Sequence, residues 1–250
     1  MKKRLIVLLT MVFLIPGFVF SDIVTFKIGY YIPRAQSDLW DVEFENMDFN
    51  RSDFQGTNFS LAYEYFVSNQ LSLMLSVDGY TKQKAGFYED YIGETIDGYD
   101  YAFDYGQGFP IAHVFSVSIT PIQLSMKLTP LGRRAKLIPF IGGGVGLYLW
   151  NVKLQGDIVD FSNYDWFYDP NIDEDVIGYW VEPADLRDDN RVKIGFHVLG
   201  GFMMPIGNRI SLEIEFKYNL NIKSDLESFR GFEAFDLSAY QIAVGLNYWF

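Results

Sequence analysis

Two histidines, His113 and His197, are the conventional general bases of this 250-residue chain. Acyl-transfer chemistry would require a nucleophile beside one of them, and the chain has no cysteine to serve. Ser116 follows His113 by three residues, a spacing that places the two side chains on opposite faces of a regular strand. We therefore predict no catalytic residue and expect that the protein is not an enzyme.

Carboxylates are the second group of residues that could support a function, because clustered carboxylates bind Ca²⁺. The stretch DPNID has the D-x-N-x-D opening of a calcium loop, and its candidate ligands are Asp169, Asn171, Asp173 and Asp175. Glu174 stands where such a loop has glycine, and Trp180 where it has a bidentate glutamate, so the stretch is not an EF-hand. A loop-bound divalent cation is the one candidate cofactor, and solvation of a surface is the alternative role of these acids.

Three glycines, Gly142, Gly144 and Gly146, are spaced by two and invite comparison with a phosphate-binding loop. No helix signal follows them, and their spacing places them on one face of a strand. We interpret them as positions that make room for bulky neighbours or allow strong coiling of a sheet.

The N-terminus carries an export signal. Lys2, Lys3 and Arg4 precede an uncharged, mostly apolar run from Leu5 to Val19, as in a secretory signal peptide cleaved ahead of Asp22. A retained anchor is the alternative, but the run is shorter than the ~20 residues that a spanning helix needs. We expect residues 1–21 to be the signal peptide and 22–250 one domain. Loss of these three cations changes the net charge from −12 to −15, which disfavours nucleic acid as a partner.

The rest of the chain alternates apolar and polar residues with a period of two, which predicts β-strands. RISLEIEFKYNL is the clearest case, with apolar residues on one face and Ser, Glu, Lys and Asn on the other. Eight such segments are VTFKIGYYI from Val24, NFSLAYEYFV from Asn58, LSLMLSVDGY from Leu71, VFSVSITPIQLSMKL from Val114, PFIGGGVGLYLW from Pro139, VKIGFHVLGGFMM from Val192, RISLEIEFKYNL from Arg209 and AYQIAVGLNYWF from Ala239. The apolar parity of the fourth changes across Thr120-Pro121, which we interpret as a β-bulge.

The connections alternate between short and long, as in an up-and-down meander with its long loops at one end. The long ones are Arg34–Gly56, Lys82–Pro110, Gln155–Arg191 and Asn221–Asp236, and they hold most of the acidic residues. Long loops at one end and short turns at the other are typical of outer-membrane β-barrels. A soluble barrel of the lipocalin type would place its apolar face inward instead.

The polar face decides between these two barrels. It carries equal numbers of cations and anions, which suit a self-neutralising lumen, while the apolar face ends in aromatic residues that suit a membrane girdle. The predicted lumen charge network is Lys27, Glu64, Asp78, Lys127, Lys193, Glu213, Glu215 and Lys217. We predict an all-β fold, an eight-stranded antiparallel up-and-down transmembrane β-barrel with long extracellular loops.

The export signal, the glycine strand IPFIGGGVGLYLW, the hairpin MPIGNRISLEIEFKY and the terminal LNYWF resemble the small bacterial outer-membrane β-barrel proteins, among them the OmpW-like, OmpX-like and opacity-type proteins. The resemblance implies location in the outer membrane. It also implies that a C-terminal Phe preceded by alternating hydrophobics is recognised by the barrel assembly machinery. The residues matching that signal are Ile242, Val244, Leu246, Tyr248 and Phe250.

For function, we expect a non-enzymatic barrel with acidic, aromatic surface loops that acts in envelope integrity or in surface binding and adhesion. Its partners would be outer-membrane lipid, the assembly machinery and an extracellular ligand. The resemblance to OmpW-like members implies an alternative, a narrow porin-like conduit for small hydrophobic solutes. A lipid A-modifying enzyme using His with Ser is a further alternative, but Phe115 and Leu199 occupy the positions two residues after the histidines where that pattern has Ser.

Overall fold

The structure is a computed structural model that describes residues 22–34, 46–104, 106–220, 223–224 and 235–250, without the side chains of residues 186–191, 223–224 and 235. The expected signal peptide, residues 1–21, lies outside the described residues, as do parts of the expected loops 34–56 and 221–236. Within the described chain, no helix is long and apolar enough to cross a membrane.

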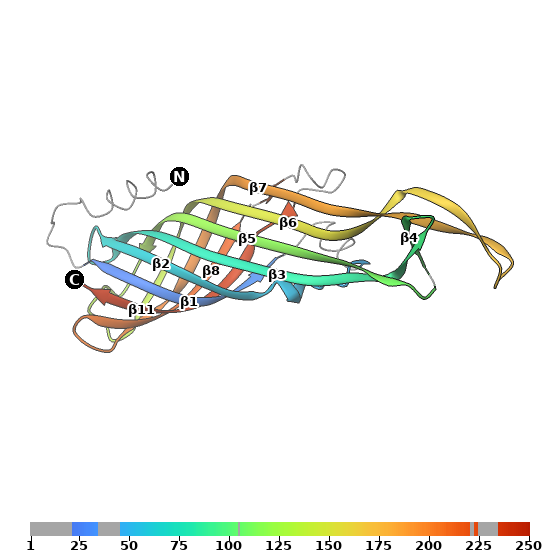
Figure 1. Cartoon of the computed structure of the whole chain (residues 1–250). Helices are drawn as coiled ribbons and strands as arrows, with labels where there is room; N and C mark the ends of the chain where they lie inside the picture. The colour runs from blue at the N-terminus through green and yellow to red at the C-terminus, as the bar shows by residue number, and fades with distance from the viewer. Residues whose placement is uncertain (1–21, 35–45, 105, 221–222, 225–234) are drawn as a thin grey trace.

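Eight antiparallel strands close into a barrel (Figure 1). They are β1 (Ile23–Pro33), β2 (Gly56–Phe66), β3 (Leu71–Ile96), β5 (Phe109–Leu128), β6 (Ile138–Asp169), β7 (Glu174–Pro205), β8 (Ile210–Leu220) and β11 (Ala239–Trp249). Each pairs with its neighbours in this order, and β11 pairs with β1 in a register that sets Tyr248 opposite Val24. The eight-stranded barrel predicted from the alternation is therefore confirmed, and closure leaves no open sheet edge around it.

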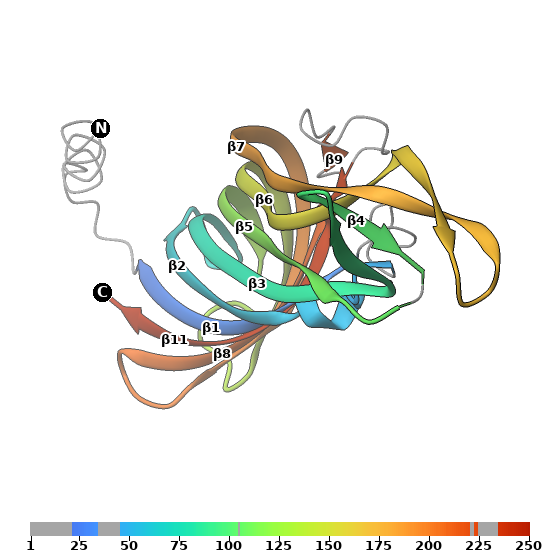
Figure 2. The same ribbon diagram turned by 45° about the vertical axis from the view of Figure 1, so that its right-hand side comes forward.

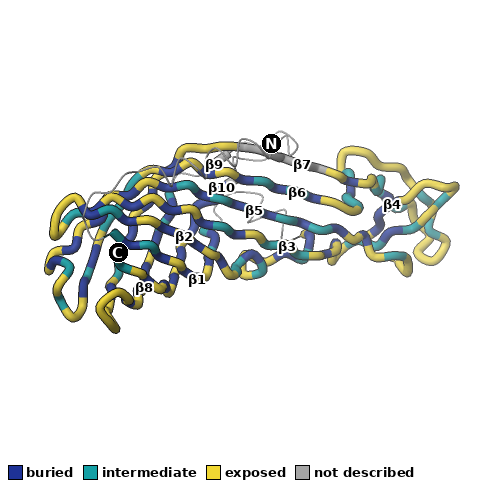
Figure 3. Tube along the Cα trace, turned by 60° about the vertical axis from the view of Figure 1, so that its left-hand side comes forward, coloured by how far each residue is buried: buried dark blue, intermediate teal, exposed yellow. Residues whose placement is uncertain are grey.

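Alternation along the strands separates an enclosed face from an outer one (Figure 3). In β8, for example, Glu213 and Lys217 are buried, whereas the intervening Ile214 and Phe216 are exposed. Charged residues inside and apolar residues outside are the reverse of a soluble barrel, so the lipocalin-type alternative is wrong.

The four central strands extend far beyond the short ones (Figures 1 and 2). β3 continues to Ile96 and turns into β4 (Tyr99–Phe103), which pairs with β3 on one side and with β7 at Tyr101–Trp180 on the other. Because β3, β5, β6 and β7 remain paired with one another, β4 closes a second, smaller ring beyond the barrel. The prediction that Lys82–Pro110 and Gln155–Arg191 are loops was therefore wrong, since most of both segments is strand.

The bulge predicted at Thr120-Pro121 was also wrong. β5 pairs with β6 in one continuous register from His113–Gly156 to Leu128–Ile141, and inward and outward positions alternate without interruption. What changes at Thr120 is the environment: the next inward residues are the apolar Ile119, Val117 and Phe115, and the outward residues there are the polar Thr120, Ser118 and Ser116. β6 changes at the same level, where outward Leu149 gives way to outward Asn151.

Three small elements complete the described chain. η2 (Arg51–Phe54) is a 3₁₀ helix that precedes β2 and buries Phe54. β9 (Lys223–Ser224) and β10 (Phe235–Asp236) form a separate two-stranded sheet. Short turns join β2 to β3, β5 to β6 and β7 to β8 at the end of the barrel opposite the second ring (Figure 1).

Candidate functional site: a filled lumen and an acidic distal module

Seven charged side chains form one alternating ion chain across the middle of the lumen. Lys127 Nζ lies 2.9 Å from Glu64 Oε2 and 3.3 Å from Glu213 Oε2. Lys27 Nζ lies 2.7 Å from Glu213 Oε1 and 2.6 Å from Glu215 Oε2. All five side chains are at least 97% buried, so each charge is stabilised by its neighbours in place of water.

The row of ion pairs continues to Lys217. With this residue, the ion pairs join side chains from five of the eight barrel strands. Lys217 Nζ lies 2.7 Å from Asp78 Oδ2 and 3.8 Å from Glu215 Oε1. It also donates a hydrogen bond of 2.8 Å to Gln123 Oε1. Three ammonium groups therefore lie among four carboxylates.

Neutral polar groups surround this ion chain and bond to its members. Ser72 donates a hydrogen bond to Glu64, and Asn247 donates one of 3.2 Å to Glu213. Gln123 also donates hydrogen bonds of 2.8 Å to both Tyr148 and Asn219. These contacts fix the carboxylates in place, so the lumen is a packed polar core.

Lys193 is the one predicted network residue that the structure does not place with the others. It occupies an inward register position opposite Tyr148, but its side chain is exposed. The reason is the unequal strand lengths: β8 ends at Leu220, which pairs with Phe196, so no residue of β8 covers Lys193. The prediction of a balanced network that includes Lys193 was therefore wrong.

The three spaced glycines lie where β6 has to pass between side chains of β5 and β7. Gly144 is opposite Ser125 on one side and His197 on the other, and these two side chains hydrogen-bond at 2.7 Å across it. A Cβ on Gly144 would collide with the carbonyl oxygen of Leu124. Gly144 thus allows close approach of β5, whereas Gly146 leaves room for the side chains of Gln123 and Tyr148, as interpreted from the sequence. The Ser–His pair is one that sequence spacing could not reveal.

An apolar layer closes the lumen on the side of the short turns. It consists of Ile23, Ala62, Phe66, Met74, Ile138, Phe140, Leu199 and Met203. Phe66 stacks on Trp249 with ring centroids 5.9 Å apart, and Lys127 Nζ lies 3.8 Å from the centroid of Phe140. The ion chain therefore borders directly on aromatic rings rather than on open solvent.

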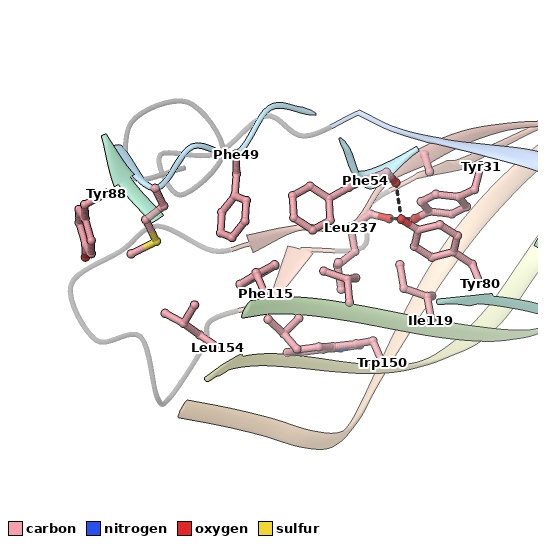
Figure 4. Close-up of a cluster of buried hydrophobic side chains, with 14 of the residues drawn as sticks. Tyr31, Phe49, Phe54, Tyr80, Tyr88, Phe115, Ile119, Trp150, Leu154 and Leu237 are labelled. Atoms are coloured by element: carbon pink, nitrogen blue, oxygen red, sulfur yellow. Dashed lines mark hydrogen bonds between the residues drawn. The ribbon is translucent and has the colours of Figure 1, made fainter. Parts of the chain in front are cut away.

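A larger apolar layer fills the lumen on the other side, at the level where the short strands end (Figure 4). Tyr31 and Tyr80 stack with centroids 4.0 Å apart, and their hydroxyls donate to the carbonyls of Leu237 and Phe54. Phe54 in turn meets Phe115 edge-on. A cavity of about 10 Å³ remains beside these rings, enough for about one water molecule.

His113 fastens the segment before η2 onto this layer. Its Nε2 donates a hydrogen bond of 3.1 Å to the carbonyl of Met47, and its ring lies edge-on to Phe49 and Tyr88. Burial lowers the pKa of His113 below its ordinary value of 6.5, so the imidazole is neutral at pH 7. His113 therefore has a structural role, in which its hydrogen bond holds the segment around Met47 against β5; we call this contact the histidine clasp.

Beyond this layer lies the second ring, which we call the distal module and define as residues 85–112 and 154–186. Its composition is one-sided, because its sequence holds fifteen acidic residues and no Lys, Arg or His. Tyr101 donates a hydrogen bond of 3.0 Å to Asp165. Burial is the larger cause and this hydrogen bond the second cause of the raised pKa of Tyr101. Tyr168 donates to Asp173, and this bond raises the pKa of Tyr168, so both phenols remain proton donors.

The four candidate metal ligands lie at the end of the β6–β7 hairpin. Asp169 Oδ1 accepts hydrogen bonds from the backbone and side-chain nitrogens of Asn171, and Asp173 accepts the one from Tyr168. Asp175 is exposed on β7 opposite Tyr168. Among the described residues, no group of three or more acidic or histidine side chains could hold a metal ion. The contacts that are present stabilise a turn.

The residues of the expected assembly signal all lie on the outer wall. Ile242, Val244, Leu246, Tyr248 and Phe250 are 41% to 66% exposed. The backbone N–H of Phe250 donates a hydrogen bond of 3.0 Å to the carbonyl of Asp22, and Trp249 points inward to Ser211. The last strand thus presents an unbroken apolar row to whatever surrounds the barrel.

No protein-family model and no curated protein sequence matches the chain. Among solved structures, the chain is similar to the outer membrane protein OprG from Pseudomonas aeruginosa, with 10% identity and a TM-score of 0.50 over 92% of this chain and 96% of that one. Neisserial surface protein A is similar with 10% identity and a TM-score of 0.45, over 92% and 97% of the two chains. The likeness to OprG shows the fold, a β-barrel like that of this outer membrane protein.

Proposed function

We propose that the protein is a non-enzymatic outer-membrane barrel that holds a rigid, acidic module at the cell surface for binding or adhesion. The observation that carries the proposal is the contrast between its two halves. The described lumen is filled by an ion chain between two apolar layers, while β3, β5, β6 and β7 continue outward and close again as the distal module. Such a molecule is built to anchor and present a surface.

The position of the membrane follows from the outer wall. Exposed side chains such as Ile214, Phe216 and Leu124 form an apolar belt that water would not favour. The belt ends at Thr120 on β5, where outward residues become polar. Below this level the strand ends are joined by short turns, which in outer-membrane barrels face the periplasm. The distal module would then point away from the cell.

The arrangement also argues against catalysis. Ser125 and His197 form the nucleophile–base contact that acyl transfer uses, but both are 1% exposed in the middle of the wall and no substrate could reach them. His113 is covered by Phe49 and Tyr88. A mass spectrum of lipid A from cells with and without the protein tests this, and a modified lipid would refute the non-enzymatic proposal.

Two measurements test the anchoring role. The chain has no cysteine, so an Ile172→Cys variant carries a single thiol at the exposed hairpin end. We expect a membrane-impermeant maleimide to label it on intact cells. We also expect no steady conductance from the purified protein in planar bilayers. Absent labelling would contradict the orientation, and steady conductance or faster entry of an apolar solute into vesicles would favour the conduit alternative.

Insertion is tested at the C-terminus. Removing Phe250 leaves the paired residues of β11 in place, because β11 ends at Trp249, and costs the one hydrogen bond from Phe250 to the carbonyl of Asp22. We nevertheless expect deletion to reduce the fraction inserted in cells as a heat-modifiable barrel, since the resemblance makes this residue part of the signal read by the assembly machinery. Refolding of the same variant into pure lipid vesicles should be nearly unchanged. Equal insertion in cells would refute the role of the terminal aromatic.

A further inference from the structure

We propose that the end of the β6–β7 hairpin, residues 164–179, is a docking site for an extended basic segment of a protein partner. The segment would add as a strand to the free edge of β6 and place alternate Arg or Lys side chains beside Tyr164, Trp166 and Tyr168. This inference rests on the proposed function, because the hairpin has to face the outside for a partner to reach it.

The two faces of the hairpin differ. Asp165 and Phe167 on β6 face the module, where Phe167 lies 4.8 Å from the ring of Tyr101. The alternate residues Tyr164, Trp166 and Tyr168 are 51%, 62% and 61% exposed. Tyr164 lies edge-on to Tyr179, with ring centroids 6.3 Å apart, and still leaves half of its surface exposed. Three neighbouring exposed aromatics mark a surface that contacts something else.

The spacing of the row matches a strand. Alternate residues of a β-strand are about 6.8 Å apart, so a second strand beside β6 would place its own alternate side chains at the same interval. Strand addition of this kind takes affinity from backbone hydrogen bonds and specificity from alternate side chains.

An edge for such addition is present. β7 pairs with one side of β6 from Tyr164–Tyr179 to Asp169–Glu174. On the other side, β5 leaves β6 after the His113–Gly156 pair, and no strand of the described chain pairs there with residues 164–169. The backbone groups of that edge are thus available to an incoming strand.

Charge selects the occupant. Neither 85–112 nor 154–186 contains a Lys, Arg or His in its sequence. Asp175 lies directly opposite Tyr168 on the exposed face. Aromatic faces attract cations, and the surrounding carboxylates add long-range attraction. A second copy of the chain, a nucleic acid or an anionic glycan would be repelled. A basic polypeptide can pair with the free edge of β6, place cations beside the exposed aromatic row and complement the negative charge.

The test uses the full-length protein in lipid nanodiscs and a fluorescent peptide of alternating Arg and Thr, eight residues long. A peptide of the same composition with its four Arg contiguous is the matched probe. We expect the alternating peptide to bind about tenfold more tightly than the block peptide, and salt to weaken binding. Methylating the backbone nitrogens on one edge of the alternating peptide should abolish binding, whereas methylating those on the other edge should not.

Variants separate the site from general acidity. Trp166→Ser should weaken binding of the alternating peptide roughly tenfold, the size of a partly desolvated cation–π contact. Tyr99→Ser removes an equally exposed aromatic from β4 and should change binding less than about twofold. Heat-modifiability on gels shows that both variants are folded.

Equal binding of the two peptides, or no effect of Trp166→Ser, would overturn the proposal and leave diffuse attraction by the acidic surface. Binding of cellohexaose in preference to the peptide would overturn it in favour of a glycan site. If Ile172→Cys is labelled on intact cells while the peptide fails to bind, this inference fails and the anchoring role stands. If the thiol is not labelled, the proposed orientation itself fails.

Discussion

Replacing Lys217 by Met should destabilise the barrel mainly through Asp78. Lys217 Nζ is 2.7 Å from Asp78 Oδ2, and the other oxygen of that carboxylate is buried without a hydrogen-bond partner. Removing the ammonium therefore leaves a buried carboxylate with no ion-pair partner among the described residues. Breaking a buried pair in this way costs on the order of 3–5 kcal/mol of unfolding free energy.

The distances rank the two carboxylates near Lys217. At an effective dielectric of about 20, the Coulomb attraction is about 6 kcal/mol at the 2.7 Å of Asp78 and about 4 kcal/mol at the 3.8 Å of Glu215, before desolvation is subtracted. Glu215 also keeps Lys27 at 2.6 Å when Lys217 is lost. Sequence spacing alone favours Glu215 as the partner because it is the nearest acid along the strand, and the structure reverses this preference.

A double-mutant cycle in urea, with the protein reconstituted in lipid vesicles, measures both couplings. We expect Lys217→Met and Asp78→Asn to couple by about 2–3 kcal/mol, and Lys217→Met and Glu215→Gln by less than about 1 kcal/mol. Asp78→Asn is the informative second change because it removes the uncompensated charge and keeps the shape of the side chain. Additive effects of Lys217→Met and Asp78→Asn would refute the argument, since they would show that water screens the lumen.

Three further predictions follow from the boundary at Thr120, from the glycines and from the histidine clasp. Leu124→Arg should cost ~2–4 kcal/mol in refolding titrations, whereas Ser116→Arg, outward on the same strand but beyond the boundary, should cost less than ~0.5 kcal/mol; equal costs would refute the boundary. Gly144→Ala should cost ~1–3 kcal/mol because its Cβ meets backbone, while Gly79→Ala, with open space around its Cβ, should be nearly neutral in the same titration. Because burial lowers the pKa of His113, its contribution to stability is fully present above the ordinary pKa of 6.5 and is lost as the pH falls from there through the lower pKa of the folded state. The hydrogen-exchange protection factors of residues 46–54, which correct for slower intrinsic exchange at lower pH, should therefore fall on acidification in the native protein, and a His113→Gln variant that kept this response would refute the structural role of His113.

The barrel was predictable because its strands separate an apolar surrounding from a polar interior. Where one face meets hydrocarbon and the other a polar lumen, each strand shows a clean alternation, as in β8, and the closed ring follows from an even number of such strands. The lumen charges were predictable for the same reason, as inward positions by parity. Their partners were not, because the Lys217–Asp78 contact joins strands whose relative height depends on register rather than on sequence spacing.

The distal module escaped prediction because its strands meet water on the outside and an apolar core on the inside, with many acids in both segments. The aromatic row at Tyr164 does alternate, and it is the signal that could have identified the hairpin. The many acids in both segments obscure this signal, since Asp and Glu are depleted in strands on average. In a closed ring the average depletion of acids in strands does not apply, because outward acids are solvated and the inward residues still pack against one another.

The apparent bulge at Thr120-Pro121 carries the most information about the membrane. A strand that crosses from hydrocarbon to water changes its outward residues from apolar to polar. If its inward residues change from polar to apolar at the same height, the two faces of the strand exchange their residue types there. β5 does so between inward Ile119 and inward Gln123, and the register with β6 shows that no residue is inserted there. Parity inversion without a bulge therefore identifies the height at which the apolar belt ends on β5. On β6 the outward residues change from Leu149 to Asn151 on the neighbouring rungs. Two adjacent strands whose outward residues change from apolar to polar at one height are explained by a planar boundary outside the barrel.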